Sequence, residues 1–120
     1  MNLLSDILVA LVAALHLYFL VLEMFLWDKP AGLRAFGQTL EAARASRVLA
    51  ANQGLYNGFL AAGLMWGLVA DNQPVKVFFL VCVLVAGLFG AATASRKILF
   101  VQALPAAIAL SLVLFRSTGA

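Results

Sequence analysis

Acidic and basic side chains stand at the ends of apolar stretches in this sequence, with a spacing that permits ligand binding. Glu23 lies near the end of the first stretch, seven residues after His16, so both share one helical face about 10 Å apart. Arg44 and Arg47 lie three residues apart just before the second stretch and also share a face. Such positive charge can hold an anionic head group or lower the pKa of a bound thiol.

Amide and phenol side chains follow at the beginning of the second apolar stretch. Asn52 and Tyr56 are four residues apart, as are Gln53 and Asn57, so each pair lies on one face of a helix. Inside a membrane such groups need hydrogen-bond partners on other helices, because lipid chains offer none.

A polar layer a few ångströms inside one side of the membrane is expected from Glu23, Arg47, Asn52 and Gln102. This layer is either a structural clamp, with Glu23 paired to Arg47, or a site for a polar or anionic head group, and the spacing favours neither. The chain has one histidine and no metal-ligand spacing, so we expect no metal site, and no catalytic residue is assigned. The candidate ligand-binding residues are Glu23, Arg44, Arg47, Asn52, Gln53, Tyr56, Asn57, Arg96 and Gln102.

The composition indicates a membrane protein. Of 120 residues, 65% are hydrophobic and 11% are charged, whereas soluble domains carry about 25% charged residues. So few charges cannot cover the surface of a small soluble protein, and disorder requires low hydrophobicity. The net charge is only +3, without a basic stripe among aromatics, which excludes direct nucleic-acid readout.

Four apolar stretches predict four membrane spans within a single transmembrane domain, residues 1–120. They cover about residues 3–27, 48–70, 75–94 and 98–115. Each has roughly 18–25 residues, enough to cross a hydrocarbon core of about 30 Å. The expected fold is an all-α integral membrane four-helix bundle with up-down topology.

The connections between the spans differ in kind. Thr39 is expected to cap a helix that begins near Leu40 and continues into the second span. The sequence DNQP predicts a tight turn, and TASRK predicts a hairpin between the last two helices. Pro105 is expected to kink the fourth helix, because it cannot donate a backbone hydrogen bond.

The distribution of basic residues predicts the orientation in the cell (inner) membrane. Loops one and three, with the start of the second span, hold six basic residues, and the opposite side holds Lys76 and Arg116. The positive-inside rule then places loops one and three in the cytoplasm and both termini outside. The six are Lys29, Arg34, Arg44, Arg47, Arg96 and Lys97.

Two segments carry a family resemblance: HLYFLVLEMFLWDKPAGLRAFGQT and RVLAANQGLYNGFLAAGLMWGL. Together they resemble the small bacterial and fungal membrane proteins catalogued as domain of unknown function 1304. The resemblance covers nearly the whole chain and implies a four-helix membrane fold, but no reaction.

The segment RVLAANQGLYNGFLAAGLMW is also similar to the second-helix signature of the membrane-associated eicosanoid and glutathione metabolism (MAPEG) superfamily. This resemblance implies an up-down four-helix bundle, a homotrimer and a glutathione site between subunits. Arg47 occupies the position of that family's arginine, and Asn52 and Gln53 fall among its amides. Gly54 and Asn57 depart from the pattern, which has an asparagine and an acidic residue there.

The same resemblance implies a thiol-activating basic residue near the fourth helix, a role for which Arg96 or Lys97 is available. Whether the chain is an enzyme is left open.

Three functions remain open from the sequence. The chain is a membrane protein that binds a lipophilic or glutathione-like thiol ligand in the polar layer, or a non-enzymatic lipid-binding or scaffold protein. The third alternative is a small multidrug-type exporter in which Glu23 binds protons and a cation alternately, although its place near a helix end counts against this. Membrane lipids and further copies of the chain, with a trimer favoured, are the expected partners.

Overall fold

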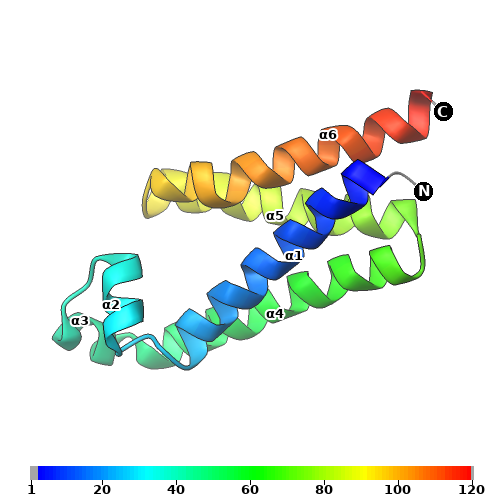
Figure 1. Ribbon diagram of the computed structural model, residues 1–120. Coiled ribbons are helices and arrows are strands. Elements are labelled where there is room, and N and C mark those ends of the chain that lie inside the picture. Colours follow the sequence, from blue (N-terminus) through cyan, green and yellow to red (C-terminus); the bar gives the residue numbers. More distant parts are fainter. Residues whose placement is uncertain (1–2, 120) are drawn as a thin grey trace. The chain divides into compact units, whose positions relative to one another are not determined.

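The chain is all-α over residues 3–119, which the computed structural model describes, with side chains described for residues 3–115. Helices stand where the four apolar stretches predicted them, but the first one ends at Met24 rather than near residue 27. It ends there because the amide of Leu26 bonds to Val21 O, five residues back, and so leaves the regular helical pattern. In chain order (Figure 1) the helices are α1 (Leu3–Met24), α2 (Pro30–Phe36), α3 (Leu40–Ala45), α4 (Arg47–Val69), α5 (Gln73–Thr93), the π-helix η1 (Leu99–Ala103) and α6 (Leu104–Gly119).

The chain divides into two compact units. The hairpin unit comprises Met1–Ala14 with Leu60–Ala120, and the loop unit comprises Leu15–Phe59. The hairpin unit therefore holds the start of α1, the end of α4, and all of α5, η1 and α6. The loop unit holds the end of α1, the two short helices α2 and α3, and the start of α4.

Small and branched apolar side chains form the core of the hairpin unit. Each long helix of the unit contributes buried side chains, so the burial of apolar surface that all of them share holds the helices together. The buried set is Val9, Val12, Ala13, Leu64, Leu80, Val83, Ala106, Ala109 and Val113.

The tight turn that the sequence predicted joins α4 to α5. Asn72 Oδ1 accepts a hydrogen bond from the Val75 amide at 3.1 Å, and Asp71 takes a positive φ of 47°. At the far end of α5, a Cβ added to Gly87 would lie 2.9 Å from the Ala103 backbone nitrogen. The two helices thus approach closely, which confirms the hairpin across TASRK.

The last helix opens with a π turn. The amide of Leu104 bonds to Leu99 O, five residues back instead of four. Pro105 has no N–H to donate to Val101 O, so a regular ladder cannot pass this point. The disturbance expected at Pro105 therefore takes the form of η1.

The connection within the loop unit is folded into α2 and α3. Thr39 Oγ1 accepts the Ala42 amide at 3.1 Å, which confirms the predicted helix cap. The helix that starts at Leu40 does not continue into α4, however, and this expectation was wrong. It ends at Ala45, and the hydroxyl of its C-cap Ser46 donates to Ala42 O at 2.9 Å and accepts from Trp27 Nε1 at 3.1 Å.

Large apolar side chains remain exposed along the helices. In the described part of the chain, α1 and α5 are the two helices long and apolar enough to cross a membrane, with mean hydropathies of 2.3 and 2.4. Within these segments only 33% and 22% of the residues are buried. The amides Asn52, Gln53 and Asn57 lower the hydropathy of α4, and Leu99–Phe115 is a shorter apolar helix.

Candidate functional site

Glycines bring α4 against α1 inside the loop unit. A Cβ added to Gly54 would lie 2.5 Å from Met24 Cγ and 3.2 Å from Glu23 Cβ. One added to Gly58 would lie 2.7 Å from Leu20 Cδ1. Because the helices already touch at these positions, small residues permit the contact and leave no space for a ligand between them.

Glu23 lies at this contact and is only 7% exposed. Asn57 Nδ2 donates a hydrogen bond to Glu23 Oε1, so the acid of α1 is held by an amide of α4. Glu23 does not pair with Arg47, the partner that the clamp alternative gave it. Arg47 is the first residue of α4, ten residues and about 15 Å of helix before Asn57.

Arg47 pairs instead with Asp28, in the turn that follows α1. The two side chains are 3.4 Å apart, and the Arg47 side chain is 66% exposed. An exposed pair of this kind contributes about 0–1 kcal/mol. Asn52 is also exposed and donates to Val48 O of its own helix at 2.9 Å, rather than to another helix as expected.

The other predicted residues do not join Glu23 in the loop unit. Arg44, Gln53 and Tyr56 are exposed there. Gln102 and the exposed Arg96 belong to the hairpin unit, where Gln102 Nε2 donates to Val83 O at 3.2 Å. Of the nine candidates, Glu23 and Asn57 are thus the pair that the structure brings into hydrogen-bond contact.

The hairpin unit contains an ionic cluster of Lys76, Asp6 and Asp71 that the sequence did not predict. Lys76 Nζ lies 3.0 Å from both Asp6 Oδ1 and Asp71 Oδ1, and its side chain is 4% exposed. The hydrogen bond from Lys76 lowers the pKa of Asp71 below its ordinary value. Asp71 is only five residues before Lys76, so the sequence offered a local indication of that pair. Asp6 is 70 residues away, and no local pattern indicates its contact with Lys76.

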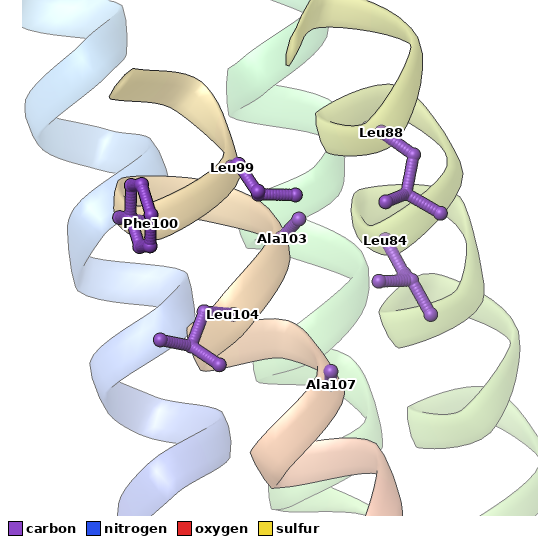
Figure 2. A pocket seen from close by; sticks show the side chains of 7 residues that line it. All are labelled: Leu84, Leu88, Leu99, Phe100, Ala103, Leu104 and Ala107. Carbon is purple, nitrogen blue, oxygen red and sulfur yellow. The ribbon is translucent and has the colours of Figure 1, made fainter. Parts of the chain in front are cut away.

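A shallow, largely open apolar groove of about 270 Å³ lies between α5 and the η1–α6 segment. Leu84 and Leu88 of α5 form one side, and Leu99, Ala103 and Ala107 form the other (Figure 2). Ala103 is buried against Gly87, and Ala107 is half-buried. Phe100 and Leu104 complete the lining, which is entirely apolar.

His16 is fully buried, and its ring meets that of Phe19 edge-on with the centroids 5.2 Å apart. Over the described residues, no three His, Cys, Asp or Glu side chains gather as metal ligands would. Cys82 is a half-buried free thiol on α5. The arrangement therefore offers a hydrogen-bonded acid, an ionic cluster and an apolar groove.

Comparison with known proteins identifies relatives of unknown function. Residues 10–114 match the family described as "Protein of unknown function (DUF1304)". The chain is similar to "Uncharacterized protein YpaA" of Lactococcus lactis subsp. lactis (strain IL1403), with 31% identity over 106 residues, covering 85% of this chain and 89% of the relative. No solved structure matches.

Proposed function

The chain belongs to the DUF1304 family of proteins of unknown function, and we propose that it is a multi-pass membrane protein that binds a lipid chain without transforming it. Membership confirms the first resemblance found in the sequence. The similarity to the MAPEG superfamily and the trimer remain proposals, as does the arrangement of four spans in an inner membrane.

The surface of the helices supports a membrane location. Val69 is 89% exposed, Leu3 75% and Phe89 70%, and many other large apolar side chains are exposed as well. In water this surface would favour aggregation, whereas lipid chains solvate it without cost. With α4 and α6 as further spans, loops one and three face the cytoplasm and both termini lie outside.

The groove between α5 and η1–α6 is the single observation that carries the ligand proposal. Its lining is apolar throughout, so an alkyl chain matches it and a polar substrate does not. Since the Glu23–Asn57 contact is closed by Gly54 and Gly58, that pair acts as a clamp between α1 and α4. In this proposal the chain binds and does not catalyse.

Photochemical labelling tests the groove. The full chain is reconstituted in bilayers containing a phospholipid with a diazirine in one acyl chain, and labelled positions are mapped by mass spectrometry. We expect labelling concentrated at Leu84, Leu88 and Phe100. Ala107→Phe should reduce it several-fold, because the new ring fills the groove.

Ala62→Phe is the matched control, since Ala62 is an exposed residue of α4 outside the groove lining. It should leave the labelling of α5 unchanged. Equal labelling of all exposed apolar faces, or no response to Ala107→Phe, would show that the groove is not a binding site.

A polar ligand held between copies of the chain is a second candidate, favoured by the exposed face of α4. Asn52, Gln53 and Tyr56 are all exposed there, close after Arg47. Polar side chains in a span need partners, and a second copy with a glutathione-like ligand would supply them.

A thermal-shift titration with glutathione tests this candidate. A ligand of the folded state at one hundred times its Kd stabilises by about 2.7 kcal/mol. A saturable shift that Arg47→Ala abolishes would support the site. No shift at millimolar glutathione would contradict this candidate, and lipid binding would remain as the proposed function.

A further inference from the structure

The connection from α1 to α4 presents basic and large apolar side chains on one folded segment. We call residues 25–47 the basic platform. Lys29, Arg34 and Arg44 are exposed on it. Phe25 is 64% exposed, and Phe36 and Leu40 are each 41% exposed.

The positive charge of the basic platform is only partly compensated by its own acidic residues. Residues 28–47 hold four basic and two acidic side chains, and one of the acids, Asp28, is already paired with Arg47. Among the side chains that the structure describes, no carboxylate lies within ion-pair distance of Lys29, Arg34 or Arg44. With Glu41 as the remaining acid, the four basic and two acidic side chains leave the segment a net charge of +2, carried by side chains that are free to meet an outside partner.

Specific contacts hold the basic platform in a defined shape. Trp27 Nε1 donates to Ser46 Oγ at 3.1 Å, which ties the end of the platform to its start. The rings of Trp27 and Phe36 pack with centroids 4.8 Å apart. Gly32 lies so close to the chain that a Cβ there would be 2.0 Å from Leu26 O.

We infer that the basic platform binds the head groups of anionic phospholipids. Arg34 and Arg44 contact the phosphates, and Phe36 and Leu40 lie among the upper parts of the acyl chains. Guanidinium groups bind phosphate through paired hydrogen bonds, and a basic segment with exposed aromatics fits the interface of an anionic leaflet. The inference rests on the membrane location proposed above but not on the groove, which is made of other residues.

Quenching of Trp27 fluorescence by brominated lipids measures the preference. The chain has two tryptophans, so Trp66→Phe leaves Trp27 as the only reporter, within the platform itself. This variant is reconstituted in bilayers of brominated phosphatidylglycerol mixed with plain phosphatidylcholine, and in the converse mixture. We expect phosphatidylglycerol to be preferred about fivefold at Trp27.

Two further arms identify the groups responsible. Adding Arg34→Ala and Arg44→Ala should reduce the preference to near one, whereas Arg96→Ala with Lys97→Ala removes equal charge elsewhere and should leave it intact. Raising the salt from about 0.1 M to about 1 M shortens the screening length from about 10 Å to about 3 Å and should also abolish the preference.

The outcomes separate this inference from the membrane location. Quenching that is equal for both lipids, or a preference that falls equally in both charge variants, overturns the platform as an anionic-lipid site. Absence of quenching by either lipid overturns the membrane location. If the basic platform serves an acidic protein instead of lipid, the reconstituted chain shows no preference between the two lipids, and this result also overturns the inference.

Discussion

Glu23 illustrates how a single acidic residue can be accommodated inside an apolar helix pair. It is buried against α4, and Asn57 donates a hydrogen bond to it. Buried polar groups are retained in proteins when such a partner is present, because an unsatisfied one loses its hydration without compensation. The pair therefore fixes the register of α1 on α4 within the loop unit, alongside the close contacts of Gly54 and Gly58.

Substitutions at this pair should have unequal effects on stability. Asn57→Ala removes the donor and leaves a buried acid, so we expect a loss of about 1–2 kcal/mol in the free energy of unfolding. Glu23→Gln keeps an acceptor oxygen for Asn57 and should cost less than about 0.5 kcal/mol. Thermal unfolding of the detergent-solubilised chain measures both.

Asn52→Ala is the matched control, because Asn52 is an exposed amide that bonds to its own helix. It should cost less than about 0.5 kcal/mol. If Glu23→Gln destabilises as much as Asn57→Ala, the charge of Glu23 matters more than its hydrogen bond, and the clamp as described is incorrect.

At the scale of helices, sequence patterns predicted the long apolar helices and the turns on either side of α5, but not the end of α1 or the break between α3 and α4. Apolar runs predicted α4 and α5 nearly to their ends, and Thr39 was correctly predicted as the N-cap of α3. At the break, Ser46 accepts a hydrogen bond from Trp27, 19 residues earlier, and no local pattern reveals this contact. The turn after α1 and this break determine how the start of α4 meets the end of α1. The sequence therefore identified Glu23 and Asn57 as candidates but did not predict the hydrogen bond between them.

The stability of the hairpin formed by α5 with η1 and α6 should depend more on Gly87 than on Gly90. A Cβ at Gly87 meets the Ala103 backbone at 2.9 Å, whereas one at Gly90 meets the end of the Ile98 side chain at 3.2 Å. Backbone cannot move aside as a side-chain end can, so Gly87→Ala should cost about 1–3 kcal/mol and Gly90→Ala less than about 1 kcal/mol. Chemical unfolding of both variants in detergent provides the comparison, and equal costs would contradict the close packing at η1.

At the scale of the molecule, the arrangement of charge and apolar surface favours a membrane protein. Most basic residues fall in loops one and three, and the long helices expose apolar side chains. Lys76, one of two basic residues assigned to the opposite side, is buried between Asp6 and Asp71. From the sequence, Lys76 entered only the count of basic residues that set the orientation, because its acidic partner Asp6 on α1 is 70 residues away.

Cysteine accessibility tests the multi-pass membrane location most directly. The chain has one cysteine, so Cys82→Ala gives a cysteine-free background in which Ala42→Cys, Ala70→Cys and Ser95→Cys are introduced one at a time at exposed positions. Bacterial cells expressing each variant are treated with a membrane-impermeant maleimide, intact and after permeabilisation. We predict that Ala70→Cys is labelled in intact cells, whereas Ala42→Cys and Ser95→Cys are labelled only after permeabilisation. Labelling of all three variants in intact cells, or of none until permeabilisation, would contradict the account.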